Sequence, residues 1–182
     1  MYKRQYRDLI KYFIELENNQ NYEDQYHGNF GALWVETYQS SLPASKVFMS
    51  ACSESGLNEN NDFNGSDQEG FGTYQVNIKN GQRCSAADAF LKPILSRPNL
   101  ELMTDTSVLK IIINNKKAVG VQVKNRQGIN VITAESEIIL CGGAINSPQL
   151  LMLSGIGPKK VLEKVNISCS HDLPGVGQNL QD

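Results

Sequence analysis

Three runs rich in β-branched residues follow one another in the second half of the chain. They cover residues 108–113, 118–123 and 131–140, and the links between them are Asn114-Asn115 and residues 125–128. Strands joined by such short links pair antiparallel, because a parallel pair needs a crossover of a dozen or more residues. The sequence therefore predicts an antiparallel three-stranded meander.

A glycine turn follows the last of these runs. Residues 138–140 lead as a strand through Cys141 into Gly142 and Gly143, and we expect a helix to begin at Ser147-Pro148. Residues without a Cβ let backbone approach a ligand, and the start of a helix favours negative charge. Two explanations stay open: a cofactor approaches this turn, or the glycines only permit tight strand-to-helix packing. The turn lacks the G-x-G-x-x-G spacing of a dinucleotide loop.

Helical and extended patterns alternate in the first part of the chain. Apolar side chains recur at helical spacing within residues 5–20, which predicts an amphipathic helix whose apolar stripe faces a core. A short strand is expected at residues 32–35. A second helix should run from Pro43, a favoured first-turn residue, to a stop at Gly56. It is expected to bury four apolar side chains: Ala44, Val47, Phe48 and Ala51.

A polar stretch separates this helix from the next elements. Residues 58–72 are rich in Asn, Asp and Gly, which predicts a long surface loop of the kind that often carries function. Residues 73–79 alternate toward a strand, and Asn80-Gly81 is a turn dipeptide. Ser85 and Asp88 resemble a capping box for a third helix, which the proline inside it should kink or break.

Charge, hydropathy and cysteine spacing exclude several classes of protein. The chain has 17 basic and 19 acidic residues, a formal net charge of -2, and no basic block, so nucleic acid is not a natural partner. No apolar run reaches the roughly 18 residues of a membrane span, and the first residues do not form a signal peptide. We therefore expect a cytoplasmic protein with no transmembrane segment. The cysteines are widely spaced, which favours free thiols in a reducing compartment over a metal site: Cys52, Cys84, Cys141 and Cys169.

Single reactive side chains do not assemble a catalytic site in the sequence. His27 lies in a polar loop with no carboxylate or cysteine at ligand spacing, and His171 lies near an extended tail, so both are expected at the surface. Ser154 stands at a helix end, where turn formation explains it better than nucleophilic attack. Three aromatic residues suit either a core or a substrate pocket: Trp34, Tyr38 and Phe48.

A longer run, residues 142–157, reads GGAINSPQLLMLSGIG and resembles the second signature of the glucose-methanol-choline (GMC) oxidoreductases. Further segments are similar to the same family, in order and spacing, across essentially the whole chain. The resemblance is to the branch of choline dehydrogenases and alcohol dehydrogenases. The supporting segments are ENN (17–19), YHG (26–28), EGFG (69–72), GQRCSAA (81–87), RPNL (97–100), AVGV (118–121) and LPGVGQNLQD (173–182).

The resemblance implies a fold and a cofactor. The fold class is mixed α/β: a partial FAD-binding domain of the glutathione-reductase type with an antiparallel β-meander, plus part of a substrate domain. Residues 1–80 would belong to the substrate or cap domain and residues 81–182 to the FAD-binding domain. The cofactor would be FAD, with the main chain of Val108 holding the adenine and Gly143 lying against the ribose and pyrophosphate.

The resemblance also implies a reaction and a fragment. Family members oxidise a small-molecule alcohol, choline-like or primary, to an aldehyde by hydride transfer to the flavin. The sequence contains neither a G-x-G-x-x-G loop nor the family's C-terminal catalytic histidine, so we expect an internal fragment with no catalytic residue and no metal site, inactive without the missing N- and C-terminal parts. The full-length enzyme could also lie at the periphery of the inner membrane. The alternative is a non-catalytic interaction or scaffold module that retained the fold.

Overall fold

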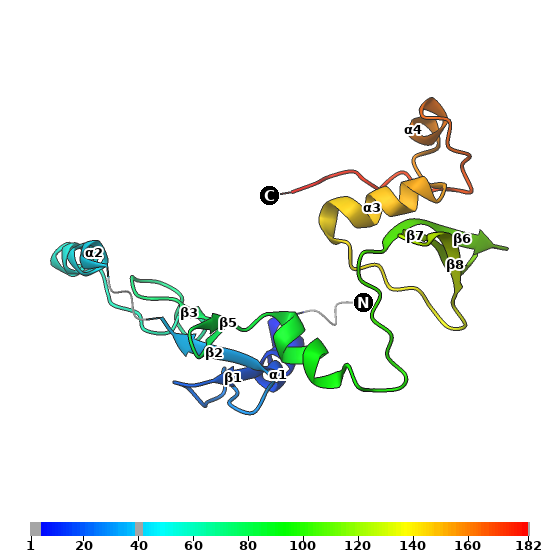
Figure 1. The fold of residues 1–182 in the computed structure, drawn as a ribbon. Helices are drawn as coiled ribbons and strands as arrows, with labels where there is room; N and C mark the ends of the chain where they lie inside the picture. Colours follow the sequence, from blue (N-terminus) through cyan, green and yellow to red (C-terminus); the bar gives the residue numbers. More distant parts are fainter. Residues whose placement is uncertain (1–4, 39–41, 182) are drawn as a thin grey trace. The chain divides into compact units, whose positions relative to one another are not determined.

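The structure is a computed structural model that describes residues 5–38 and 42–181. The chain divides into two compact units, Met1–Glu101 and Leu102–Asp182, which are described separately (Figure 1). Each unit mixes helices with small sheets, which agrees with the predicted mixed α/β class. The predicted boundary at residue 80 separates a substrate or cap domain from an FAD-binding domain, and it stays a prediction.

A three-stranded sheet organises the first unit. Helix α1 (Tyr6–Leu16) ends where the polar run begins, and the start of that run forms β1 (Glu17–Asn19). β1 pairs in parallel with β2 (Leu33–Thr37), and β2 pairs antiparallel with β3 (Gln75–Val76). The strand expected at residues 32–35 is therefore β2. No side chain of α1 is fully buried, so its apolar stripe is only partly covered, contrary to expectation.

The loop between β1 and β2 lies directly against the end of α1. A Cβ on Gly28 would lie 2.0 Å from the carbonyl oxygen of Ile14, and one on Gly31 would lie 2.2 Å from the carbonyl oxygen of Leu16. The main-chain N–H of Asn19 donates to the Gly28 carbonyl oxygen at 2.8 Å and holds the loop on β1. Any side chain larger than hydrogen at Gly28 or Gly31 would push the loop away from the helix.

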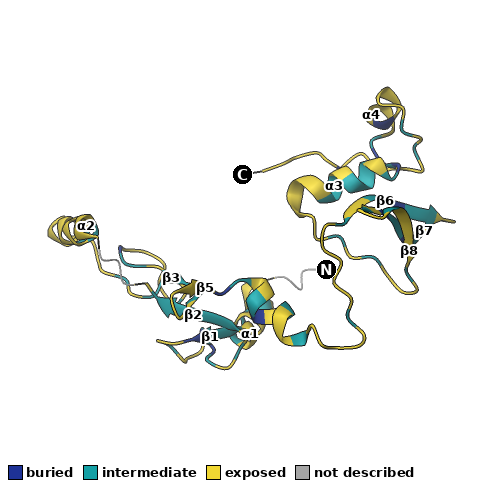
Figure 2. Cartoon of the chain, in the orientation of Figure 1, coloured by how far each residue is buried: buried dark blue, intermediate teal, exposed yellow. Residues whose placement is uncertain are grey.

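The second helix begins where the sequence predicts, but it buries little. α2 (Pro43–Glu54) has its proline in the first turn and stops two residues before Gly56. Cys52 is its one buried residue. The expectation that α2 buries four apolar side chains was wrong, because no described element packs on that face closely enough (Figure 2): Ala44, Val47, Phe48 and Ala51 are all exposed.

A tight hairpin follows the long loop. β4 (Ile78–Lys79) and β5 (Gln82–Arg83) pair antiparallel across Asn80-Gly81, whose φ angles are 53° and 73°. Two successive positive φ angles are the condition of a type I′ hairpin turn, which favours Asn-Gly. The predicted turn is confirmed. The strand expected at residues 73–79 is interrupted at Asn77, whose side-chain amide donates to the Trp34 carbonyl oxygen at 3.1 Å.

The capping box is present, but the helix that follows it is irregular. The Ser85 main-chain N–H donates to Asp88 Oδ2 at 3.1 Å, and the Asp88 N–H donates back to Ser85 Oγ at 3.2 Å. The next turns are a π-helix, η1 (Ala87–Leu91), and a 3₁₀-helix, η2 (Lys92–Ile94). Pro93 lies inside η2, so the predicted break at the proline is confirmed.

The predicted meander forms the centre of the second unit. β6 (Ser107–Asn114), β7 (Lys117–Asn125) and β8 (Gly128–Thr133) pair antiparallel in that order, which leaves β6 at one edge. Its buried hydrophobic side chains are Ile111 and Val123, at 6% and 2% exposure. The small core therefore lies between β6, β7 and the helix that packs on β6.

Two details of the strand-turn-helix prediction were wrong. β8 ends at Thr133, and residues 138–140 form no strand, since no strand among the described residues pairs with them and an isolated extended segment has no ladder partners. The helix, α3 (Gly143–Leu153), begins four residues before Ser147-Pro148 and carries the proline inside it. The order of extended segment, glycine turn and helix is nevertheless as predicted.

A compact C-terminal part follows α3. β9 (Ile156–Gly157) pairs in parallel with β10 (His171–Asp172), and α4 (Lys159–Lys164) lies between them in the sequence. Leu162 of α4 is 1% exposed. None of the helices in the described ranges has the length and apolar character needed to cross a bilayer.

Candidate cofactor site

A cavity of about 450 Å³ opens beside the glycine turn. Its walls come from the first residues of β6, from the extended segment before α3, and from α3 itself. Val108 and Gly142 line the same cavity, and Gly143 follows Gly142 as the first residue of α3. The meander thus brings the two predicted FAD-binding positions to one region. The lining residues are Ser107, Val108, Ile139, Leu140, Cys141, Gly142, Asn146, Ser147, Gln149, Leu150 and Leu153.

The two glycines of the turn have different reasons to be glycine. A Cβ on Gly142 would lie 3.1 Å from the Cβ of Asn146, so tight local packing accounts for it. Gly143 has a φ of 81°, and a Cβ there would meet no atom within 4 Å. Its backbone conformation, rather than crowding, requires glycine. Crowding therefore does not explain Gly143, and the open side of the turn leaves room for a ligand.

The surroundings of the turn suit an uncharged or anionic group. No lining residue is acidic or basic. The Gly142 N–H already donates to Ser147 Oγ at 3.0 Å, so the N–H groups that remain for a ligand are those of the first turn of α3. Main-chain N–H groups at a helix start bind phosphate well. The aliphatic side chains of Ile139 and Leu150 add apolar surface to the lining.

At Val108, the main chain rather than the side chain is the group available for specific binding. It pairs with Val123, and the register shifts between Val108 and Lys110, which marks a β-bulge. The side chain is 44% exposed, so packing does not require valine. β6 is an edge strand, and alternate residues of an edge strand present main-chain groups away from the sheet. The arrangement is compatible with main-chain binding by Val108, which stays a prediction.

His27 lies in the first unit, and the expectation that it is a surface residue was wrong. It is 2% exposed. Its Nδ1 lies 3.0 Å from Glu17 Oε2, and its Nε2 lies 3.0 Å from Asp62 Oδ2. These partners are 10 and 35 residues away in the chain, so no local spacing pattern could reveal them. His171, in contrast, is exposed in β10 as expected.

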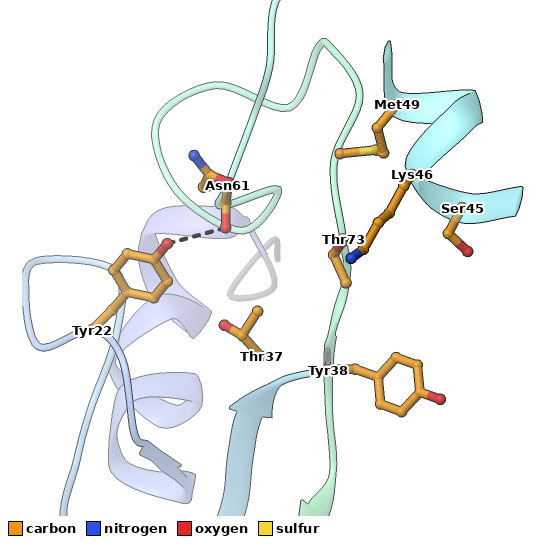
Figure 3. A pocket seen from close by; sticks show the side chains of 8 residues that line it. All are labelled: Tyr22, Thr37, Tyr38, Ser45, Lys46, Met49, Asn61 and Thr73. Atoms are coloured by element: carbon orange, nitrogen blue, oxygen red, sulfur yellow. Dashed lines mark hydrogen bonds between the residues drawn. The ribbon is translucent and has the colours of Figure 1, made fainter. Parts of the chain in front are cut away.

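A groove of about 740 Å³ lies between α2 and the long loop of the first unit (Figure 3). The Tyr22 hydroxyl donates across it to the Asn61 carbonyl oxygen at 3.0 Å. Among the aromatic candidates, Tyr38 lines this groove, and Phe48 shares an adjoining hollow with Tyr38. Trp34 lines neither, and its indole N–H donates to Glu36 at 3.1 Å. The groove residues are Tyr22, Thr37, Tyr38, Ser45, Lys46, Met49, Asn61 and Thr73.

Comparison with known proteins identifies the family. A family model described as GMC oxidoreductase matches residues 3–182. The chain belongs to the GMC oxidoreductase family. This assignment confirms the resemblance inferred from the signature at residues 142–157, and it confirms FAD as the cofactor expected for the family.

Curated relatives match the chain over most of its length. An oxygen-dependent choline dehydrogenase from Brucella ovis is 42% identical over 177 residues, which cover 97% of this chain and 32% of the relative. An alcohol dehydrogenase [acceptor] from Pseudomonas putida is 46% identical over 173 residues, which cover 93% of this chain and 31% of the relative. The chain thus spans about a third of the length of the curated relatives it matches.

Solved structures of the family share the fold. Pyridoxine 4-oxidase from Mesorbium loti superposes with a TM-score of 0.93 at 32% identity, covering 100% of this chain and 36% of that protein. An FAD-dependent oxidoreductase from Chaetomium thermophilum superposes with a TM-score of 0.89 at 29% identity, covering 97% of this chain and 33% of that protein. The mixed α/β class predicted from the sequence is confirmed. Val108 and Gly143 remain predicted binding residues.

Proposed function

We propose that this chain is part of a flavoenzyme that oxidises a choline-like or primary alcohol to an aldehyde. Support comes from two relatives, a choline dehydrogenase and an alcohol dehydrogenase, which are 42% and 46% identical to it. Since the chain spans only about a third of each, the catalytic groups are proposed to lie in the parts of the enzyme outside these residues.

The observation that carries the proposal is the cavity beside Gly143. Its volume suits one portion of a dinucleotide rather than a whole FAD, and its walls carry no charge. The main chain of Val108 would hold the adenine. The first-turn amides of α3 would face the ribose and pyrophosphate, and the open Cβ position of Gly143 leaves room for them.

In this proposal the chain binds the cofactor, and the groups that react with the alcohol lie outside the chain. When bound, the flavin supplies the acceptor for the hydride that leaves the α-carbon of the alcohol. The residues of this chain position the adenine end of the cofactor and exclude water from it. No residue of this chain is assigned to proton transfer, so the chain alone is proposed to be inactive.

The test compares the 182-residue chain with a chain extended to the length of its relatives. Each is assayed with choline and a series of primary alcohols, using oxygen and an artificial electron acceptor, and its flavin absorbance is recorded. We expect turnover and bound flavin only in the extended chain. Turnover by the 182-residue chain would overturn the assignment of roles. An extended chain without flavin would overturn the proposed function and favour the non-catalytic scaffold module.

A further inference from the structure

The buried His27 is placed to carry two protons on its ring. Nδ1 and Nε2 each lie 3.0 Å from a carboxylate oxygen, of Glu17 and Asp62 respectively. A neutral imidazole has a single N–H, so one of these contacts would then set a nitrogen lone pair against a carboxylate oxygen. Only the doubly protonated imidazolium donates to both partners. The two carboxylates are 17% and 20% exposed, whereas the histidine side chain is 1% exposed.

The neighbouring amide does not provide an alternative acceptor for the ring. Asn19 Oδ1 accepts the main-chain N–H groups of Asn21 and Tyr22 at 2.9 and 3.1 Å, which fixes the orientation of the amide. Its Nδ2 therefore points toward the ring, 3.3 Å from Nδ1, and donates to Glu17 Oε1 and Gln75 Oε1 at 3.0 Å each. The proton on Nδ1 has Glu17 as its acceptor.

The charged and titratable groups around His27 all favour a cation. Besides Glu17 of β1 and Asp62 of the long loop, Asp24 accepts the His27 main-chain N–H at 3.0 Å, and the Tyr22 ring lies 5.4 Å from the imidazole. In the described part of the chain, no lysine or arginine forms a salt bridge with Glu17 or Asp62. Burial lowers the pKa of His27, but the hydrogen bonds to Glu17 and Asp62 outweigh it and raise the pKa above 6.5.

The two bonds of His27 join parts of the chain that are far apart in sequence. Glu17 begins β1, whereas Asp62 belongs to the loop at residues 58–72. That loop closes on itself, since Asn60 N–H donates to the Phe71 carbonyl oxygen at 2.8 Å. A second link to the loop between β1 and β2 is the bond from Tyr22 to Asn61, and both residues line the groove of Figure 3. His27 therefore contributes the charged link between the loop and the sheet.

We propose that His27 is a protonation-dependent latch that holds the loop at residues 58–72, and with it the Asn61 side of the groove, against the sheet. With the imidazolium present, both carboxylates are bonded and the loop is held. When the proton leaves, the ring keeps a single N–H and no charge, so one carboxylate loses its donor, the bond to Asp62 is at most a neutral hydrogen bond, and the hold on the loop weakens. Because the folded pKa lies above the unfolded one, the latch is fully formed below pH 6.5 and weakens as the pH rises through the folded value.

The test measures amide hydrogen exchange in residues 58–72 of the full chain, expressed as protection relative to the intrinsic rate at each pH. The wild-type loop should lose about tenfold or more of its protection between pH 6 and pH 9, the loss expected for one charge-assisted hydrogen bond. Asp62→Asn and His27→Gln should show low, pH-independent protection. Asp67→Asn is the matched control: it makes the same charge change in the same loop, but Asp67 Oδ1 only accepts the nearby Glu69 N–H.

A second readout covers the case in which a variant does not fold. The chain has two histidines, so His171→Gln assigns the ring Hε1 resonance of His27 in a proton NMR titration. We expect a midpoint above 6.5 in the wild type, a lower one in Asp62→Asn, and no change in Asp67→Asn. A wild-type midpoint at or below 6.5 would overturn the latch. So would loop protection that is the same at both pH values.

Discussion

Ser154 Oγ accepts the main-chain N–H of Ile111 at 2.7 Å, 43 residues away in the sequence. The same hydroxyl donates to the Leu150 carbonyl oxygen at 2.6 Å. One side chain thus ties the C-terminal end of α3 to the middle of edge strand β6. The candidate cavity is lined by the first residues of β6 and by α3 as far as Leu153, the neighbour of Ser154, so this bond holds α3 against β6 beside the cavity.

Ser154→Ala should expose the Ile111 amide to exchange. The substitution leaves a buried N–H without an acceptor, which costs about 1 to 3 kcal/mol, or roughly tenfold or more in protection. Amide exchange at Ile111, read by NMR or mass spectrometry, measures the effect. Ser55→Ala is the matched control, because Ser55 Oγ also donates to a carbonyl oxygen four residues back but accepts no long-range N–H from residues 5–38 or 42–181. Unchanged protection at Ile111 in Ser154→Ala would contradict the role of this bond.

Gly143→Val should abolish flavin binding in the chain extended to the length of its relatives. The valine must adopt a φ near 81° and would extend into the open space proposed for the cofactor. Gly81→Val is the matched control, because Gly81 has a φ of 73° and an equally open Cβ position but lies in the β4–β5 hairpin. Flavin absorbance per protein measures the result. A flavin-saturated Gly143→Val protein would remove this residue from the site.

Val108→Ile should leave flavin content and activity nearly unchanged. The proposed contact uses the main chain, and the 44% exposed side chain has room for one more methyl group. Flavin titration of the extended chain and its steady-state kinetics check this expectation. A marked loss of affinity would show that the side chain itself meets the cofactor, and main-chain binding would then be wrong.

The stability of the first unit should fall as the pH rises above 6.5. His27 has a folded pKa above its ordinary value, so its contribution is complete below 6.5 and is lost as the pH passes through the folded value. Trp34, the single tryptophan, pairs with Asn18 of β1 and reports unfolding of this unit by fluorescence. His27→Gln should flatten the dependence, and His171→Gln should retain it. A stability that rises through this range in the wild type would contradict the prediction.

The 182-residue chain alone is expected to be poorly stable and prone to aggregate. Large apolar side chains face solvent on three helices, among them Phe13 of α1, Phe48 of α2 and Ile145 of α3, which are 57%, 65% and 70% exposed. Light scattering during a thermal melt measures this. A soluble monomer that melts in one sharp transition would instead favour the self-contained scaffold module.

The elements that the sequence predicted well depend on neighbours in the chain. The meander follows from its β-branched runs and short links, the hairpin from Asn80-Gly81, and the start of α2 from Pro43. Residues 138–140 were predicted as a strand because their side chains favour one, but a strand exists only beside a partner. Propensity contains no information on that partner.

The candidate sites also depend on contacts that local sequence patterns do not contain. Val108 has no reactive side chain, and only the family resemblance indicated it; Gly143 was visible as a turn, but its positive φ was not. His27 was missed because Glu17 and Asp62 come to it through the fold of two loops. One local feature of the sequence does indicate that Asp62 is not fully exposed. It lies beside a phenylalanine in the otherwise polar long loop, and a phenylalanine in such a stretch suggests partial burial.

The contact of Gly28 with the end of α1 makes the position of His27 depend on the neighbouring glycine. The loop that carries His27 packs directly on α1 at the next residue, where a Cβ on Gly28 would lie 2.0 Å from the Ile14 carbonyl oxygen. A mutation of Gly28 would therefore disable the histidine without touching it, and selection on the histidine would act on the glycine as well. Lineages that lose one residue of the pair should be free to lose the other.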